Sequence, residues 1–315
     1  MLGNEIKTLG KQVFALNVPL SLSTDQPNNA TMRRLSPKQR RVDIKEALSQ
    51  WHTLYSHLAS KGIVYLVPSH PGLQDLPYVA NLGAILHHRD NVAVVSNFRS
   101  EPRVEEAAVG LEFFASLGFE TVLAPKYFEG EADFKYLREN IYFGAHGLRT
   151  SPEALAWFRD EHDANVVPIH VYDESLYHLD CLVFPISPER VILCADVVDE
   201  PTRRQVERVA EIIPIDYDLA NRGLTNVVWC GQEILCDSPI ETLSRDDALY
   251  DVESRKVATL ERIAGDNGLG VRIFHMSEFY KSGAMLSCMV MNLNHPLAMK
   301  AAAEVADTAA GKRAA

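Results

Sequence analysis

The amino-acid sequence predicts an α/β chain that folds as a five-bladed propeller, with five repeated units closed by the N-terminal segment. The first observation is a recurring unit of two short strands joined by a turn, a helix and a short buried strand. The second is the spacing of those buried strands, which return roughly every 45–57 residues, a period typical of propellers and arrays. An open parallel sheet is the commoner arrangement for alternating strands and helices, but the paired strands in each unit favour the propeller.

The N-terminal segment is expected to form a strand, a helix and a strand at residues 13–18, 43–60 and 63–67. Four units follow, each as strand, strand, helix and strand: 78–86, 92–96, 103–117 and 121–123; 134–137, 141–143, 152–162 and 165–169; 177–184, 190–194, 201–212 and 213–215; 225–228, 233–236, 251–264 and 271–273. The fifth begins with a strand at 288–293 and needs residues 13–67 to complete it. We therefore expect one catalytic domain over residues 1–295, followed by an Ala-rich helix or tail at 296–315.

The composition excludes several classes of protein. The 315 residues are 47% hydrophobic, which allows a large core, and the net charge of −11 argues against nucleic acid as a partner. No apolar run approaches a membrane span, and the start lacks the apolar region of a signal peptide, so we expect a cytoplasmic protein with no membrane partner. Five cysteines without a C-x-x-C pair indicate reduced thiols. No phosphate loop, dinucleotide fingerprint or metal-ligand spacing occurs, so neither a cofactor nor a metal is expected.

Two stretches far apart in the sequence carry candidate chemistry. A turn containing Gly283 leads to Cys288, at the start of the predicted strand 288–293. If residues 177–184 form a strand, His178 and Asp180 share a face, because residues two apart on a strand do so. A cysteine, a histidine and a carboxylate are the groups needed for thiolate chemistry on a cationic substrate.

Six motifs, each weak alone, occur in a fixed order. They are Asn28-Asn29-Ala30-Thr31-Met32, Tyr78-Val79-Ala80-Asn81, Phe128-Glu129-Gly130-Glu131-Ala132-Asp133, Gly144-Ala145-His146-Gly147-Leu148-Arg149-Thr150, His178-Leu179-Asp180 and the segment from Gly283 to Cys288. In this order the chain resembles the guanidine-modifying superfamily, also called pentein or amidinotransferase-like proteins, over residues 13–295. That superfamily includes arginine deiminases, dimethylarginine dimethylaminohydrolases, glycine amidinotransferases, succinylarginine dihydrolases and arginine dihydrolases. The resemblance implies the pentein fold and a small guanidino compound as substrate, and it suggests a homo-oligomer.

The resemblance also implies roles for individual residues. Cys288 corresponds to the nucleophile, His178 to the general acid and base, and Glu129 to the carboxylate that completes the catalytic set. Asp180 corresponds to a second carboxylate that holds the guanidinium, which matches the fixed fork of donors that a guanidinium presents. The family binds the carboxylate of its substrate with arginines, and the matching positions are Arg149 and Arg99, with Arg103 as a rival for Arg99. Asn28 or Asn29 is expected to line the same pocket.

Two departures from the superfamily pattern bear on the reaction. Deiminases, methylarginine hydrolases and amidinotransferases usually carry an aspartate where this chain has Asn81, and an amide there resembles the dihydrolases. The segment after Glu129 also has one residue more than the usual Glu-Gly-Gly-Asp, which leaves Glu131 as an alternative to Glu129 in the site.

The resemblance and Asn81 together predict a cysteine-dependent hydrolase of L-arginine or a close derivative. It would act through a covalent amidino-thioester and, as a dihydrolase, give ornithine, carbon dioxide and ammonia. The alternatives are a single-step dimethylarginine dimethylaminohydrolase or arginine deiminase that gives citrulline, an amidinotransferase, and a relative that binds its ligand without catalysis.

Overall fold

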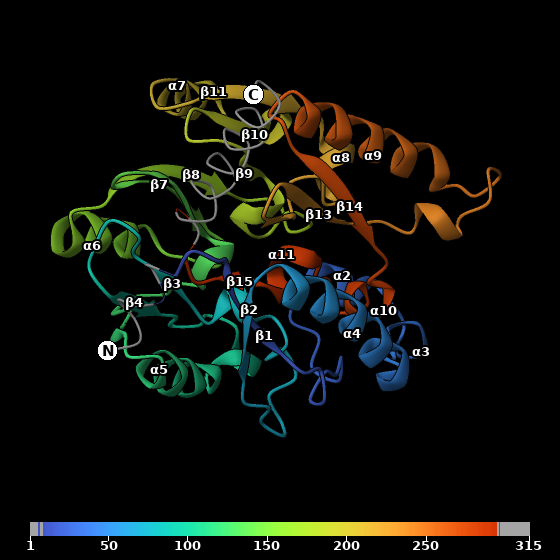
Figure 1. The fold of residues 1–315 in the computed structure, drawn as a ribbon, viewed down its shortest axis with the longest axis horizontal. Coiled ribbons are helices and arrows are strands. Elements are labelled where there is room, and N and C mark those ends of the chain that lie inside the picture. The colour runs from blue at the N-terminus through green and yellow to red at the C-terminus, as the bar shows by residue number, and fades with distance from the viewer. Residues whose placement is uncertain (1–5, 7–8, 295, 297–315) are drawn as a thin grey trace, which may run out of the picture.

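The computed structural model describes residues 6, 9–294 and 296, and it has a mixed α/β architecture with five three-stranded sheets (Figure 1). In every sheet the middle strand is antiparallel to one neighbour and parallel to the other. Except for Pro296, the tail predicted at 296–315 lies outside the described residues.

The order of the strands repeats from sheet to sheet. The sheets, with their middle strand second, are β3 (Gly83–Ile85), β4 (Val92–Val95) and β5 (Glu120–Leu123); β6 (Phe134–Arg138), β7 (Ile141–Gly147) and β8 (Asn165–Val171); β9 (Val183–Pro185), β10 (Arg190–Cys194) and β11 (Glu211–Ile215); β12 (Val228–Cys230), β13 (Glu233–Asp237) and β14 (Gly270–Phe274); and β15 (Met291–Asn292), β1 (Val13–Asn17) and β2 (Ile63–Val67).

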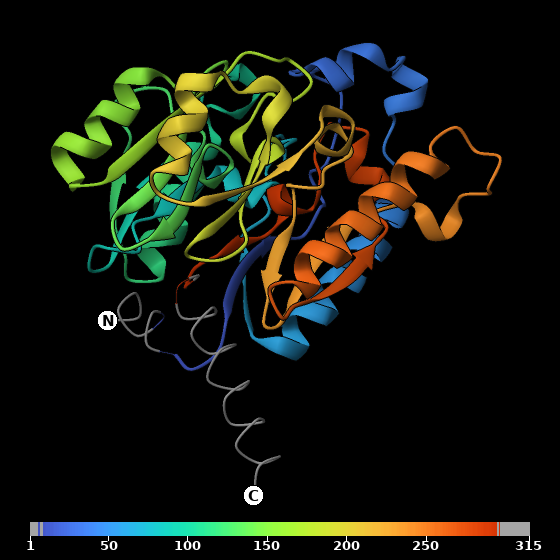
Figure 2. The same ribbon diagram turned by 90° about the horizontal axis from the view of Figure 1, so that it is seen from above.

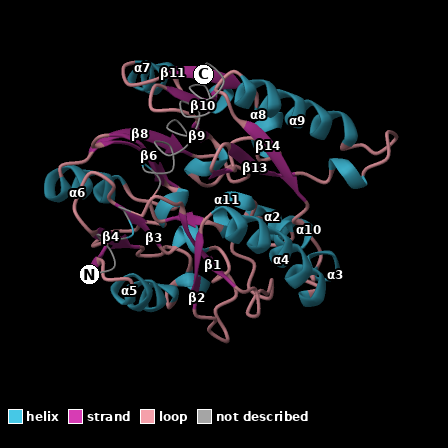
Figure 3. Cartoon of the chain, viewed as in Figure 1, coloured by secondary structure: helices cyan, strands magenta, loops and turns pink. Residues whose placement is uncertain are grey.

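One longer helix connects the two parallel strands of each sheet. These helices are α4 (Ile44–Lys61), α5 (Glu106–Ser116), α6 (Pro152–His162), α7 (Glu200–Glu207) and α9 (Tyr250–Gly265). Asp43, Ser151 and Asp199 cap three of them, because their side chains accept hydrogen bonds from backbone N–H groups in the first turn. In Figure 3 the strands lie mostly inside the molecule, and α5, α6, α7 and α9 lie toward its edge.

Shorter helices lie between these elements. They are α2 (Ala30–Arg34), α3 (Pro37–Arg40), α8 (Tyr217–Asn221), α10 (Ser277–Tyr280) and α11 (Leu286–Met289), together with the 3₁₀ helices η1 (Val79–Asn81), η2 (Glu101–Arg103), η3 (Gly130–Ala132), η4 (Leu179–Cys181), η5 (Ala195–Val197) and η6 (Ile240–Thr242). Helix α11 lies near the middle of the molecule in Figure 1.

One sheet joins segments from opposite ends of the described chain. Strand β15 pairs antiparallel with β1, with Phe14 opposite Asn292, and β1 pairs parallel with β2. Figure 2 shows the dark blue β1 beside the red segment that holds β15. The predicted completion of the fifth unit by the N-terminal strand, helix and strand is therefore present in the structure.

The structure corrects the sequence prediction at three places that carry polar residues. The segment predicted as one strand at 78–86 begins with η1, and the one at 177–184 begins with η4, so His178 and Asp180 do not lie on a strand. Cys288 lies in α11, and only Met291–Asn292 of the predicted strand 288–293 is a strand. In each case one short turn precedes a shorter strand, because the buried polar side chains there point into a site and not into an apolar sheet face.

The core is divided among several groups of buried apolar side chains between the sheets and their helices. In the part of the chain that the structure describes, no helix is both long enough and apolar enough to cross a membrane.

Candidate active site

The candidate site is built from the same position in successive units, namely the turn that precedes the first strand of each sheet. Asn81 ends η1 before β3, Glu129 precedes η3 before β6, and His178 precedes η4 before β9. Asn226 lies just before β12, and Cys288 lies in α11 before β15. A fold of repeated units therefore brings five separate turns together around one small volume.

A pocket of about 310 Å³ lies among these turns. Its lining combines the nucleophile candidate with cations, a carboxylate and amides: Asn28, Asn29, Asp75, Tyr78, Asn81, Arg103, Arg149, Tyr177, His178, Ser282, Ala284 and Cys288. A second cavity at its mouth shares Asn28, Asn29, Arg149 and Tyr177 with it.

Cys288 is buried, with 6% of its surface exposed, and its sulfur has two polar neighbours. Its Sγ lies 3.6 Å from Oδ2 of Asp180 and 3.7 Å from Nδ2 of Asn226. Burial, and next the negative charge of Asp180, raise the pKa of the Cys288 thiol to about 12. Without a bound cation the residue is therefore a thiol at neutral pH, and a guanidinium in the pocket would favour the thiolate.

Helix α11 is fixed by hydrogen bonds to neighbouring turns. The Ser287 N–H donates to Oδ1 of Asn226 at 2.8 Å, and the Ser287 hydroxyl donates to Oδ2 of Asp180 at 2.6 Å. Gly283 precedes the helix with φ of +78°, and a Cβ there would lie 2.7 Å from Oδ1 of Asn29. A glycine is therefore required at this position by both its backbone conformation and its neighbour.

His178 and Glu129 form a buried hydrogen-bonded pair. Nε2 of His178 lies 2.8 Å from Oε2 of Glu129, and Nη1 of Arg149 lies 3.3 Å from each oxygen of the same carboxylate. Burial raises the pKa of Glu129, but the charges of Arg149 and His178 outweigh it and hold that pKa well below its usual range. Glu129 is thus an anion that orients the imidazole and stabilises its protonated form.

A second carboxylate holds this pair in place. Oδ2 of Asp133 accepts the Thr150 hydroxyl at 2.7 Å, and Oγ1 of Thr150 accepts the Glu129 N–H at 3.2 Å. Oδ1 of Asp133 accepts the Leu179 N–H at 3.1 Å, in the turn that carries His178. One buried side chain therefore links the turns that supply the glutamate and the histidine.

Asn81 lines the pocket with 1% of its surface exposed. Its Nδ2 has no hydrogen-bond partner within the described residues. The turn itself is fixed, since the Ser96 hydroxyl donates to the Asn81 carbonyl at 2.5 Å and a Cβ on Gly130 would lie 2.8 Å from that oxygen. An amide donor thus points into a polar pocket with a fixed backbone behind it.

The structure separates the two arginines that the sequence left as rivals. Arg103 lines the pocket, where it is 5% exposed and donates to both oxygens of Glu106. Arg99 is exposed, donates to the carbonyls of Gly147 and Leu148, and lies over the ring of Tyr127. The structure therefore brings Arg103 and Arg149 together in the pocket and places Arg99 outside the residues that line it.

The remaining candidates are also divided by their positions. Asn28 and Asn29 both line the pocket: Asn28 donates to Oδ2 of Asp75 at 2.6 Å, and Asn29 donates to the Ser282 carbonyl at 2.8 Å. Glu131 lines a different cavity, whereas Glu129 contacts His178. The carboxylate before the glycine is therefore the one beside the histidine.

The sequence analysis missed five residues of the site: Asp75, Tyr78, Tyr177, Asn226 and Ser282. A signal for Asp75 was present, since it is a charged residue among Leu73, Leu76 and other apolar positions and is only 3% exposed. Asn226 could have been found from its place in the unit, because it stands directly before a first strand as Asn81 does. The two tyrosines and Ser282 lie within or beside motifs already identified and carry no separate signal.

These groups together supply a nucleophilic sulfur, a histidine paired with a glutamate, and further carboxylates and amides for a planar cation. Two arginines beside them match an anionic substrate end. Within the described part of the chain, no three His, Cys, Asp or Glu side chains are grouped to hold a metal ion. The fold and this site define an arginine-modifying enzyme of the guanidine-modifying, or pentein, superfamily.

The family can be stated more closely. The model of the family described as "N,N dimethylarginine dimethylhydrolase, eukaryotic" matches residues 18–293, and the chain belongs to this family.

The chain is also similar to individual proteins. It is 26% identical over 256 residues to ArgZ of Synechocystis sp. and 27% identical over 257 residues to AgrE of Nostoc sp., each described as a bifunctional arginine dihydrolase/ornithine cyclodeaminase. These matches cover 80% of this chain and 34% of each relative, so the chain spans about a third of their length. An uncharacterized protein of Caenorhabditis elegans, ZK1307.1, is 24% identical over 256 residues, which cover 80% of this chain and 85% of that protein.

Solved structures share the fold. The N-terminal domain of ArgZ bound to substrate has a TM-score of 0.77 at 23% identity, and the match covers 90% of this chain and 98% of that domain. A dimethylarginine hydrolase (DDAH) from Pseudomonas aeruginosa complexed with citrulline has a TM-score of 0.66 at 15% identity, with 90% and 99% of the two chains covered.

Proposed function

We propose that this protein hydrolyses the guanidino group of L-arginine, or of a close derivative, through a covalent intermediate on Cys288, and that it does so twice. The products are ornithine, carbon dioxide and two molecules of ammonia. Residues 1–295 act as a single catalytic domain whose five sheets close into a five-bladed propeller, and the pairing of β15 with β1 supports this closure. The similarity to relatives described as arginine dihydrolases supports the activity.

The observation that carries the proposal is the Asn81 amide, whose Nδ2 has no partner within the described residues. An arginine guanidinium carries only donors, so it needs an acceptor at this position, which Oδ1 can supply. The ureido group left after the first hydrolysis carries an oxygen acceptor, which Nδ2 can bind. An aspartate would suit only the guanidinium, whereas an amide can hold both groups during two successive attacks.

In the first half of the reaction, the Cys288 thiolate forms a bond to the guanidinium carbon. Asp180, whose Oδ2 lies 3.6 Å from the sulfur, is placed to accept hydrogen bonds from the bound cation. His178, oriented by Glu129 at 2.8 Å, gives a proton to the leaving nitrogen, and ammonia departs. Water, deprotonated by the same imidazole, then attacks the amidino-thioester carbon, and the C–S bond breaks to leave a ureido group and the thiolate.

The second half repeats these steps on the ureido carbon. Ammonia leaves again, the resulting thiocarbamate is hydrolysed by a second water, and the carbamate formed loses carbon dioxide to give ornithine. One arginine and two waters are thus consumed for each ornithine, one carbon dioxide and two ammonia.

The amino-acid end of the substrate is held by the opposite side of the pocket. Arg149 and Arg103 are the cations placed there to bind its carboxylate, and Arg103 takes the role that the sequence offered first to Arg99. Asp75 is placed to bind its ammonium group, and Asn28 and Asn29 fix that wall through their contacts with Asp75 and Ser282.

A second candidate function is the single-step hydrolysis of dimethylarginine to citrulline and dimethylamine. It is favoured by the description of the family to which the chain belongs. In that reaction the ureido product leaves after the first cycle, so the Asn81 donor would have no second role.

The deciding experiment is a time course of the purified full chain with L-arginine, and separately with dimethylarginine, that measures ornithine, citrulline, ammonia and dimethylamine. A Cys288→Ser variant is the matched control, since it keeps the size of the side chain and removes the thiol. Two ammonia per ornithine from arginine, absent in the control, is the expected result. Citrulline as the end product from either substrate would refute the double hydrolysis, and dimethylamine release would establish the second candidate. Turnover of neither substrate would refute both.

A further inference from the structure

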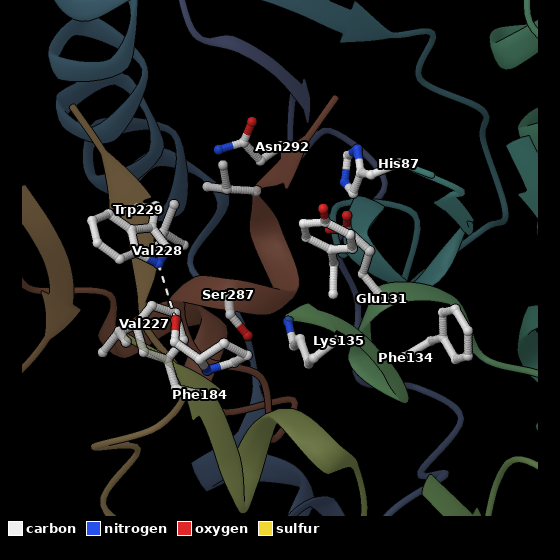
Figure 4. Close-up of a pocket in the computed structure, with 13 residues that line it drawn as sticks. His87, Glu131, Phe134, Lys135, Phe184, Val227, Val228, Trp229, Ser287 and Asn292 are labelled. Atoms are coloured by element: carbon white, nitrogen blue, oxygen red, sulfur yellow. Dashed lines mark hydrogen bonds between the residues drawn. The ribbon is translucent and has the colours of Figure 1, made fainter. Parts of the chain in front are cut away.

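A second cavity lies on the other side of the turn that carries the nucleophile (Figure 4). Ser287 lines this cavity, whereas the next residue, Cys288, lines the catalytic pocket. The second cavity encloses about 530 Å³ of empty space, a volume suited to a small molecule. None of Arg149, His178 or Asn81 lines it, so it is distinct from the site described above.

The wall of this cavity holds charges of both signs. Glu131 and Lys135 both line it, and their charges interact. Burial raises the pKa of Glu131 to about 7, against the opposing influence of Lys135 and of a hydrogen bond from the Asn292 backbone. A ligand with a carboxylate alone would be repelled by Glu131, and a ligand with an ammonium alone would be repelled by Lys135. A zwitterion satisfies both.

An unpartnered amide points to a ligand that brings an acceptor. Asn292 lines the cavity with 7% of its surface exposed, and its Nδ2 has no hydrogen-bond partner among the described residues. Leaving such a donor buried and unpaired costs on the order of 1–3 kcal/mol, and a ligand oxygen would remove that cost. Figure 4 shows Asn292 at one end of the cavity, with Lys135 and Glu131 on the same wall.

The opposite wall is apolar. Phe184, Val228 and Trp229 line it, and Figure 4 shows them across the cavity from Glu131 and His87. The Trp229 indole N–H donates to the Pro185 carbonyl at 3.2 Å, so this large ring is fixed. A wall of this kind binds hydrocarbon and cannot pair with further charge.

We propose that this cavity is a binding site for an α-amino acid with an apolar side chain. Its carboxylate pairs with Lys135 and the Asn292 amide, its ammonium pairs with Glu131, and its side chain packs on Trp229, Phe184 and Val228. The site is separate from the catalytic pocket and does not depend on which guanidino compound is hydrolysed there.

The test is calorimetric titration of the full chain with L-alanine, L-valine, L-leucine and L-proline, with Trp229 fluorescence as a second readout. L-Leucinamide lacks the carboxylate and 4-methylpentanoate lacks the ammonium, so each probes one charged contact. Lys135→Met and Glu131→Gln test the protein side, with Lys126→Met and Glu112→Gln as matched controls at exposed positions. Arg149→Met reports on binding in the catalytic pocket.

At least one of the four amino acids is expected to bind saturably and to perturb Trp229 emission. Its affinity should fall by about 10-fold or more when either charged group of the ligand, or either Lys135 or Glu131, is removed, which corresponds to the loss of a charged hydrogen bond. The two surface controls and Arg149→Met should leave the affinity unchanged. No saturable binding of any of the four up to about 50 mM would overturn the proposal. Loss of binding in Arg149→Met but not in Lys135→Met would overturn it as well, since the ligand would then lie in the catalytic pocket.

Discussion

Replacing Asp180 by asparagine should make the nucleophile more reactive while it abolishes turnover. In the free protein the Asp180 carboxylate lies 3.6 Å from the Cys288 sulfur and raises the pKa of the thiol. At that separation and an effective dielectric constant of 20, the repulsion between carboxylate and thiolate is about 4.6 kcal/mol, or about 3 pKa units. Burial contributes more than Asp180 to the rise from the ordinary value of 9.0 to about 12, so we expect a fall of about 1–2 units in the Asp180→Asn variant.

The assay is alkylation by iodoacetamide without substrate, followed residue by residue by peptide mass spectrometry. A fall of about 1–2 pKa units multiplies the thiolate fraction at pH 8, and therefore the rate at Cys288, by about 10–100-fold. Cys181, whose sulfur lies 3.6 Å from the other oxygen of Asp180, should respond in the same direction. Cys194, Cys230 and Cys236 serve as internal controls, and Asp218→Asn removes an exposed carboxylate elsewhere.

Hydrolysis of arginine by the same variant should fall by about 100-fold or more, because the guanidinium loses a charged partner. Opposite changes in alkylation and in turnover are the signature of a carboxylate that raises the thiol pKa until a cation binds. An unchanged or slower alkylation rate at Cys288 would refute this account of the site.

Four further predictions follow from the geometry. Asn81→Asp should accumulate citrulline from arginine in place of ornithine, measured by amino-acid analysis; ornithine formed at the wild-type rate would contradict the role given to the amide. Thr150→Val should lower the free energy of unfolding by about 1–3 kcal/mol and reduce kcat, because the Asp133 and Glu129 hydrogen bonds are lost; Thr53→Val, which removes one exposed bond within a helix, is the control for denaturant unfolding. Glu131 has a folded pKa of about 7, above its usual 4.5, so the native state binds more protons and its stability falls as pH rises from about 4.5 to 7. Glu131→Gln should reduce that fall by about 1–3 kcal/mol in unfolding measured at pH 5 and pH 8, and an unchanged pH dependence would show that Glu131 titrates normally. Arg99→Ala should leave the KM for arginine within about 3-fold of wild type, as expected for an exposed side chain; a rise as large as that of Arg149→Met would place Arg99 in the site after all.

Much of the fold was predictable from the sequence because apolar periodicity reflects burial. Helix α6 (Pro152–His162) and strand β10 (Arg190–Cys194) have the bounds that were predicted, and the pairing of β1 with β15 follows from the incomplete fifth unit. The errors gather where the chain carries chemistry. Residues 78–81, 178–181 and 288 lie in short helical turns, and apolar alternation cannot reveal a turn whose polar side chains are buried in a pocket.

The candidate site could be predicted in part for a related reason. Cys288, His178, Glu129 and Asn81 stand in motifs that the sequence shows, and their common place before a first strand is visible only once the strands are known. Asp75 and Arg103 could not be assigned, because their role depends on which side of a buried turn faces the pocket. The oligomeric state stays a prediction from the resemblance.

The pairing of β15 with β1 has a consequence for synthesis of the protein on the ribosome. Strand β1 emerges near the beginning of translation, but its partner follows only after nearly the whole described chain has been made, since Phe14 pairs with Asn292. At about 5–20 residues per second, one edge of β1 therefore waits from about 15 s to about a minute for its neighbour. Cys288 lies on the same late segment as β15, so the nascent chain acquires its nucleophile and its last sheet partner together. A nascent chain interrupted before this segment would expose an open strand edge and have no means of attacking a guanidinium.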